Sequence, residues 1–132
     1  METEIPVRDI MTRPVITVGA DLDILSAAKK MGSANVGSLI ITAEGKTTGI
    51  LTERDLVKKV LAEGKDPRAI KVIEIMSSPV VSIEPDASLR EAAALMLRSG
   101  VKRLPVISNG RLVGIITDTD LASGSSVGMS DI

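Results

Sequence analysis

An internal repeat constrains the fold of this chain more than any other feature. The shift that carries Met11 to Met76 also pairs residues 7–56 with residues 72–121 without a gap. The matched positions include Pro14 and Pro79, Asp21 and Asp86, Ala27 and Ala92, Met31 and Met96, Val36 and Val101, Leu39 and Leu104, Gly45 and Gly110, and Gly49 and Gly114. A unit of about fifty residues buries so little surface that it would be only marginally stable alone. The sequence therefore predicts two tandem copies of one unit that fold together.

Each copy has the element order β-α-β-β-α. In the first copy, residues 15–18 form a β-rich run, and Asp23 can cap a helix whose Ile24, Ala27 and Met31 recur at helical spacing. Residues 36–42 and 48–51 have the apolar character of two strands. A helix then runs from Glu53 to a terminating Gly64. This order predicts an α/β (α+β) fold with an aliphatic and methionine core.

The second copy repeats this order with clearer local signals. Ser88 and Glu91 form a capping box, residues 108–111 contain the Asn-Gly pair of a hairpin turn, and the last helix reaches about Ala122. The paired strands of one copy can cover the other, which predicts a pseudo-two-fold sandwich with two clefts between the copies. The predicted boundaries are 7–63 and 72–122 for the repeats, 64–71 for a linker and 123–132 for a flexible tail.

The composition excludes several classes of function. The 132 residues contain no Cys and no His, which rules out disulfides, Cys/His zinc sites and Ser-His or Cys-His nucleophiles. A net charge of −1 and the absence of Phe, Tyr and Trp argue against general nucleic-acid binding. No Asp/Glu pair is spaced for acid–base catalysis beyond what helix capping explains. We therefore expect neither an enzyme nor a metal site.

The chain carries no sign of export or of a membrane span. Residues 1–4 lack the basic segment and apolar run of a secretory signal, and no apolar run approaches the ~18–20 residues of a spanning helix. We expect a cytoplasmic protein that does not bind membranes.

The stretch Gly49–Leu56, which recurs at residues 114–121, is the strongest candidate for function. In each copy an apolar strand is followed by a Thr and, three residues later, by an Asp at the start of a helix. A hydroxyl and a carboxylate there could hold a phosphorylated, hydroxylated ligand, because the N–H groups at a helix start are unpaired. Thr-x-x-Asp is also close to a capping box, so the pair could simply begin the helix. Both interpretations remain open from the sequence.

With these motifs in place, the chain resembles a tandem pair of cystathionine-β-synthase-type (CBS) domains, a Bateman module. The resemblance covers about residues 7–122. It rests on Ile10-Met11-Thr12 and Ile75-Met76-Ser77, each followed closely by Pro-Val, on Arg103-Leu104-Pro105-Val106, and on Gly-Ile-x-Thr-x-x-Asp closing both copies.

The resemblance implies a regulatory module that binds AMP, ADP, ATP or, in some members, S-adenosylmethionine in the clefts between repeats. It implies that the closing Asp binds the ribose, that the nearby Thr and basic residues bind phosphate, and that the partner copy holds the adenine. One cleft would combine Asp120, Thr117, Thr119 and Arg103 with Thr12, Val15, Ile16, Val36 and Gly37. The other would combine Asp55, Thr52 and Arg54 with Ser77, Val80, Val81, Val101 and Lys102.

The two copies differ at these positions. Lys102 and Arg103 correspond to Gly37 and Ser38, so the first copy lacks the basic pair. The pair could bind phosphate or could be an ordinary solvated basic pair. The two clefts should therefore differ in their affinity for the ligand, and one of them could be empty.

These expectations lead to one main function and one alternative. The main one is a non-catalytic regulatory module that signals in trans to a separate, unidentified protein. The alternative is a structural or protein-interaction module with vestigial, empty clefts. We also expect a homodimer, because small residues at Ala27-Ala28 and at 92–94 allow close helix approach and the short last helix leaves apolar surface uncovered.

Overall fold

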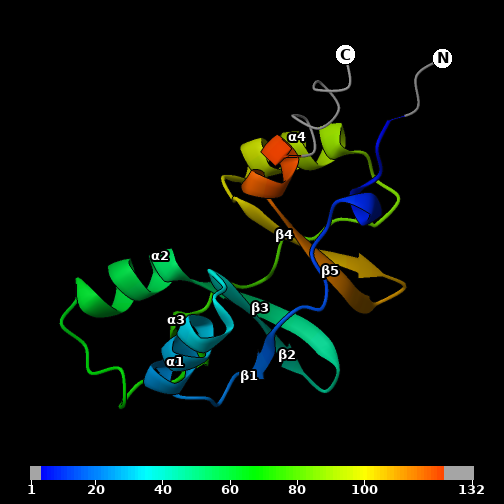
Figure 1. The fold of residues 1–132 in the computed structure, drawn as a ribbon. Coiled ribbons are helices and arrows are strands. Elements are labelled where there is room, and N and C mark those ends of the chain that lie inside the picture. Colours follow the sequence, from blue (N-terminus) through cyan, green and yellow to red (C-terminus); the bar gives the residue numbers. More distant parts are fainter. Residues whose placement is uncertain (1–3, 124–132) are drawn as a thin grey trace. The chain divides into compact units, whose positions relative to one another are not determined.

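The computed structural model describes residues 4–123, which divide into two compact units (Figure 1). Unit one contains residues 4–15 and 81–123, and unit two contains residues 16–80. These units are not the two sequence repeats. The opening segment of the first copy belongs to unit one with the body of the second copy, and the opening segment of the second copy belongs to unit two. The predicted tail, apart from Ser123, lies outside the described residues.

Unit two has a mixed three-stranded sheet. Its elements are β1 (Thr17–Gly19), α1 (Ile24–Ala34), β2 (Ser38–Ala43), β3 (Lys46–Thr52), α2 (Glu53–Asp55), η2 (Leu56–Leu61) and α3 (Val72–Ile75). The strand order is β1-β2-β3, with β1 parallel and β3 antiparallel to β2. The order β-α-β-β-α predicted for the first copy is confirmed, and α3 belongs to the opening segment of the second copy.

Unit one is built around an antiparallel hairpin. Its elements are η1 (Val7–Asp9), α4 (Leu89–Ser99), β4 (Arg103–Ser108) and β5 (Arg111–Thr117), followed by a helix over residues 118–123. At the turn, Asn109 and Gly110 both have positive φ, 52° and 79°. Two such residues are characteristic of a type I′ turn, as the Asn-Gly pair predicts.

The first strand expected in the second copy is reduced to a single bridge between Ile83 and Val106. The cause is a proline in the neighbouring strand. In the first copy, the N–H of Ile40 donates to the carbonyl of Ile16 at 3.0 Å. Pro105 stands at the position of Ile40 and has no N–H to donate, so one rung of the ladder cannot form.

The core of each unit is aliphatic, as the composition requires. The helices α1 and α4 bury matching faces through Ile24, Ala27, Met31, Ala92 and Met96. These side chains pack against the central strands of their own unit. Burying a large aliphatic side chain stabilises a fold by about 1.5–3 kcal/mol, so each such residue on these faces stabilises its unit. The assignment of Met31 to the core is confirmed, and Met96 is buried at the matching position.

The helix starts follow the predicted caps, with one correction. The Asp23 carboxylate accepts from the Ser26 N–H at 2.9 Å, which confirms the cap of α1. The Ser88 hydroxyl accepts from the Glu91 N–H at 3.0 Å, but the reciprocal bond, from the Ser88 N–H to the Glu91 carboxylate, is absent among the described contacts. Only half of the expected capping box is therefore present.

The helix after Glu53 is not the continuous α-helix that the sequence predicts. A single turn, α2, passes into η2, which is a π-helix. The N–H of Ala62 donates to the carbonyl of Val57 at 2.9 Å, five residues back. Gly64 ends the segment with a positive φ of 68°, as expected for a C′ glycine. In this segment Val60 is buried, whereas Val57 and Leu61 are exposed by 55% and 71%.

Each hairpin is extended by the opening segment of the other copy. In unit one, Thr12 and Ile115 exchange N–H···O=C bonds of 2.8 and 3.1 Å. In unit two, Ser77 and Ile50 exchange bonds of 2.9 and 3.1 Å. A glycine makes the approach possible, because a Cβ on Gly114 would lie 2.5 Å from the Met11 Sδ. This pairing brings Thr12 and Ser77 beside the hairpins that carry the closing motifs.

No helix within residues 4–123 combines the length and apolar character that a membrane span requires.

Candidate functional site

The polar residues singled out in the second copy gather at one end of the β4–β5 hairpin. Arg103 lies directly opposite Thr117 in the antiparallel register. The N–H of Asp118 donates to the carbonyl of Lys102 at 2.9 Å, which ties the start of the last helix to the start of β4. The hairpin therefore brings a guanidinium, a hydroxyl and the following carboxylates into one neighbourhood, as expected.

Thr117 and Asp120 hold each other in a reciprocal cap. The Thr117 N–H donates to Asp120 Oδ2 at 2.9 Å, and the Asp120 N–H donates to Thr117 Oγ1 at 3.1 Å. Asp120 is half-buried, and its Oδ1 makes no hydrogen bond or ion pair within the described part of the chain. Capping and ligand binding are therefore compatible, because the cap uses one carboxylate oxygen and leaves the other.

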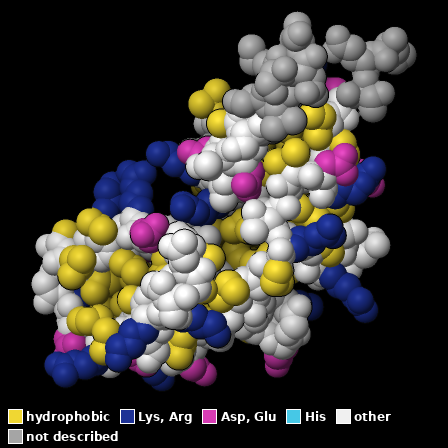
Figure 2. Space-filling view, viewed as in Figure 1, with side chains coloured by type: hydrophobic (Ala, Val, Ile, Leu, Met, Phe, Trp, Pro, Cys, Tyr) yellow, Lys and Arg dark blue, Asp and Glu magenta, His cyan; other side chains and the backbone are white. Residues whose placement is uncertain are grey.

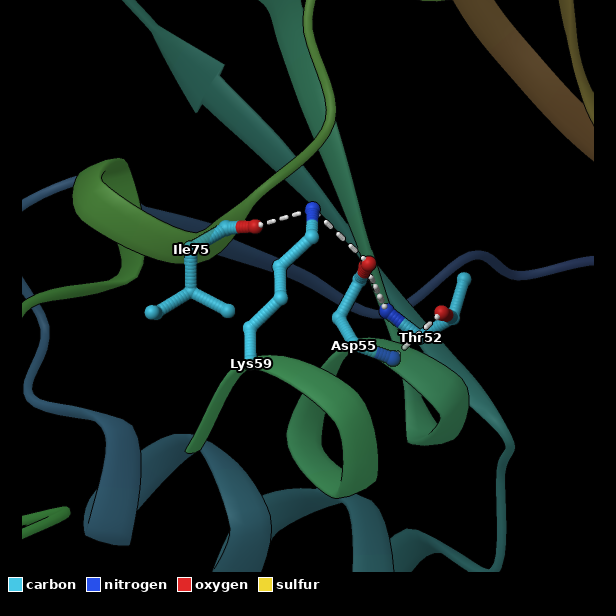
Figure 3. Close-up of polar contacts among 4 residues, drawn as sticks. All are labelled: Thr52, Asp55, Lys59 and Ile75. Carbon is cyan, nitrogen blue, oxygen red and sulfur yellow. Dashed lines mark hydrogen bonds and ion pairs between the residues drawn. The ribbon is translucent and has the colours of Figure 1, made fainter. Parts of the chain in front are cut away.

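The matching site in unit two has a different environment. Thr52 and Asp55 form the same reciprocal cap, with distances of 2.9 and 3.2 Å. Ser38, not a basic residue, lies opposite Thr52. Asp55 Oδ1 lies 3.1 Å from the Nζ of Lys59, which also donates to the carbonyl of Ile75 at 3.0 Å (Figure 3). Both oxygens of the Asp55 carboxylate thus have partners inside unit two.

Sequence reasoning missed Lys59. The available signal was its position four residues after Asp55, a spacing at which opposite charges meet on a helix. The second copy has Gly124 at the corresponding position.

The remaining predicted residues are distributed over both units. Unit one also contains Thr12, Val15, Val81 and Val101, and unit two also contains Ile16, Val36, Gly37, Arg54, Ser77 and Val80. The valines at 81 and 101 pack at the edge of the unit-one core, and Ile16 and Val36 do so in unit two. Arg54 is exposed in α2. Each predicted cleft draws on both units, so its assembly remains a prediction.

A hollow of about 350 Å³ lies beside Val36 and Gly37 in unit two. Its lining consists of Ala28, Met31, Gly32, Asn35, Val36, Gly37, Glu53 and Leu56. Ala28 and Gly32 are the small α1 residues that line this space. A larger hollow between β1 and α1 contains none of the predicted site residues. The smaller hollow is the more relevant one, because it contains two residues expected to contact the base.

The carboxylates with shifted pKa values lie outside the candidate site. Hydrogen bonds from the Ser26 hydroxyl and N–H lower the pKa of Asp23, and bonds from the Arg68 N–H and guanidinium lower the pKa of Asp66. Both shifts are explained by local structure, a helix cap and a turn, and indicate no catalytic group.

Two copies that each close on Gly-Ile-x-Thr-x-x-Asp beside a hairpin define a tandem CBS domain pair. The chain belongs to this family: the model of the CBS domain matches residues 7–62 and 72–126. The resemblance that predicted the clefts is therefore confirmed at the level of family and fold.

Known proteins similar to this chain share the whole repeat pair. An uncharacterized protein of Methanopyrus kandleri is 40% identical over 119 residues, 89% of this chain and 61% of that relative. A hexameric CBS-CP12 protein from bloom-forming cyanobacteria matches with a TM-score of 0.90 and 32% identity, covering 96% of this chain and 75% of the other. The CBS domain pair of protein MJ0100, in complex with 5′-methylthioadenosine and S-adenosyl-L-methionine, matches with a TM-score of 0.86 and 32% identity. The match covers 96% of this chain and 99% of the other.

Proposed function

We propose that the chain is a non-catalytic regulatory module that binds an adenosine-containing ligand and signals in trans to a separate protein. The observation that carries this proposal is the half-buried Asp120, whose Oδ1 has no partner within residues 4–123 while its Oδ2 accepts from the Thr117 N–H. A carboxylate fixed in this way can accept hydrogen bonds from two neighbouring ribose hydroxyls. Hydrogen bonds to a charged group contribute about 1.5–3 kcal/mol each, enough to determine whether a nucleoside binds.

Arg103 supplies the charge that a phosphorylated ligand requires. It lies across the hairpin from Thr117, and the planar guanidinium matches the geometry of a phosphate. We assign the ribose to Asp120 and the phosphate to Arg103, Thr117 and Thr119. Arg103 would not be needed for a ligand without phosphate, so its contribution distinguishes nucleotides from other adenosyl compounds.

The base is expected to bind between aliphatic groups. The sequence contains no aromatic residue to stack on a purine, so backbone groups and side chains such as Val36 must provide the slot. Within unit two, the hollow beside Val36 and Gly37 is lined by apolar side chains and by backbone, the kinds of group that this expectation requires. The ligand could be AMP, ADP, ATP or S-adenosylmethionine, and the ligands of the MJ0100 pair make adenosyl compounds the first class to test.

The test is a thermal-shift screen of the full chain with AMP, ADP, ATP and S-adenosylmethionine. A ligand present at about one hundred times its dissociation constant adds ~2.7 kcal/mol to the free energy of unfolding, so the melting temperature should rise by several degrees. Guanosine nucleotides provide the matched control and should produce no comparable shift. The absence of any shift with all four adenosyl ligands would contradict the proposal.

A second candidate function is protein interaction through unit two. Val57, Leu61 and Ile73 are exposed by 55%, 71% and 55%. Figure 2 shows hydrophobic and basic side chains together on the part of unit two that contains α2 and η2. Such apolar surface commonly marks a contact with another protein. In this alternative the clefts are vestigial, and the screen above separates the two functions.

A further inference from the structure

The ammonium group of Lys59 makes the two closing carboxylates chemically different. Asp55 and Asp120 occupy equivalent positions and make the same cap with the preceding Thr. Only Asp55 has a lysine four residues later, and its Oδ1 lies 3.1 Å from Lys59 Nζ (Figure 3). Gly124 stands at the matching position after Asp120 and has no side chain that could form this pair.

Lys59 is held in place by a second contact. Its Nζ donates to the carbonyl of Ile75 at 3.0 Å, at the end of α3. The side chain of Asp55 is only 10% exposed, whereas that of Lys59 is 44% exposed. The ammonium therefore covers the outer oxygen of a nearly buried carboxylate and ties it to a neighbouring element.

A neutral ribose competes poorly for such a carboxylate. The ammonium brings an opposite charge as well as a donor to the carboxylate, whereas a ribose hydroxyl brings only a donor. A diol that displaced Lys59 would also leave the Ile75 carbonyl without its donor. Asp120 presents no such competition among the described residues.

From these contacts we infer that Lys59 locks Asp55 into an internal ion pair, so that Asp120 alone accepts ribose and each chain binds one adenosyl ligand instead of two. Lys59 is thus a specificity-determining residue that acts through Asp55. This inference rests on the proposed function, since it determines which of two equivalent motifs serves it. Arg103, to which we assign the phosphate, lies in the same hairpin as Thr117 and so on the side of Asp120.

Calorimetric titration of the full chain with AMP, and separately with S-adenosylmethionine, tests the inference. The wild type should bind one ligand per chain, Asp120→Asn should weaken binding at least about 10-fold, and Asp55→Asn should leave it unchanged. Lys59→Met should expose a second site and raise the stoichiometry to two. Lys58→Met, a change at the neighbouring exposed lysine, is the matched control. This variant should still bind one ligand per chain.

Three results would overturn the inference. They are two ligands per wild-type chain, a single ligand in folded Lys59→Met, and an Asp55→Asn defect as large as that of Asp120→Asn. Circular dichroism verifies the fold, and Lys59→Gln replaces the Met variant if that variant does not fold.

A ligand-independent measurement separates the lock from the proposed function. If the wild type binds neither ligand, the proposed function fails, and the lock is then judged from the melting temperatures of Lys59→Met, Asp55→Asn and the double variant. Coupled shifts, in which the second change adds little to the first, support the lock. Additive shifts contradict it.

Discussion

Asp55 and Asp120 show how two residues with the same local role can differ in function. Each caps the start of a helix through the Thr three residues earlier, and this local geometry follows from the Thr-x-x-Asp spacing. Their remaining oxygens differ, because only Asp55 faces Lys59. A motif alone would assign both residues to ribose binding, whereas their side-chain environments favour Asp120.

Asp120→Ala should weaken adenosyl-ligand binding by about 10- to 100-fold, because charged hydrogen bonds to the ribose are lost. Asp120→Asn should lose similar affinity but retain the acceptor for the Thr117 N–H, and with it most of the cap's contribution to stability. Titration calorimetry measures the affinity and urea unfolding measures the stability. If both variants bind as well as the wild type after correction for folding, Asp120 has only a capping role.

Asp23 provides a pH-dependent test at the start of α1. Hydrogen bonds from Ser26 lower its folded-state pKa below the ordinary value of 3.8. Its stabilisation is therefore fully present above the unfolded pKa and is lost as the pH falls from about 4 through the lowered folded value. Asp23→Asn keeps a capping side chain but does not titrate, so its stability should fall less steeply in this window.

Urea unfolding at intervals from about pH 6 to pH 2 measures this difference. Asp66 also has a lowered pKa, but it is present in both proteins and cancels in the comparison. Parallel stability curves for the two proteins would contradict the assigned role of Asp23.

At the scale of elements, glycines permit the pairing of hairpins with opening segments. Gly49 and Gly114 lie where the segment around Met76 or Met11 crosses the hairpin of its unit. A strand needs a glycine at such a place because another backbone approaches closely. The contact is long-range in sequence, and it joins the start of each copy to the end of the other.

Gly114→Ala should destabilise the chain by about 1–3 kcal/mol, because a Cβ would lie 2.5 Å from Met11 Sδ and 3.2 Å from the Thr12 carbonyl oxygen. The matched control is Gly32→Ala in α1, where a Cβ has no neighbour within 4 Å. That change should stabilise the helix by about 0.5–1 kcal/mol, since alanine favours helix more than glycine does. Chemical denaturation compares both, and a neutral Gly114→Ala would show that the segment can shift.

At the scale of the whole molecule, the predicted homodimer rests on exposed surface. Ala27 and Ala92 are buried inside their own units and cannot contact a second chain, whereas Ala93 and Ala94 are exposed. Val57, Leu61, Ile73 and Leu97 are exposed, and they supply apolar surface of the kind that commonly marks contacts.

Sedimentation equilibrium at micromolar concentration should give twice the monomer mass of 13.8 kDa. Leu61→Glu in η2 should shift the equilibrium toward the monomer, because it places a charge on this surface. Lys58→Glu, on the same segment, controls for charge alone. A mass near 13.8 kDa for the wild type would reject the dimer.

The sequence by itself determined the repeat, the aliphatic core and most elements. Residues such as Met31, Asp23 and Asn109 act through spacings of a few positions, which helix, cap and turn geometry fix locally. For the same reason the neighbourhood of Arg103, Thr117 and Asp120 was predictable, since one short hairpin connects them.

Only the tertiary structure decided which segments pair and which carboxylate remains available. Thr12 meets Ile115 and Ser77 meets Ile50 across long stretches of chain, so the compact units do not follow the repeats. Pro105 removes one rung from a ladder only because of the strand that lies beside it. Lys59 is spaced to reach Asp55, but its second contact with the Ile75 carbonyl depends on α3 packing against η2. Long-range pairing depends on packing, and short-range spacing cannot encode it.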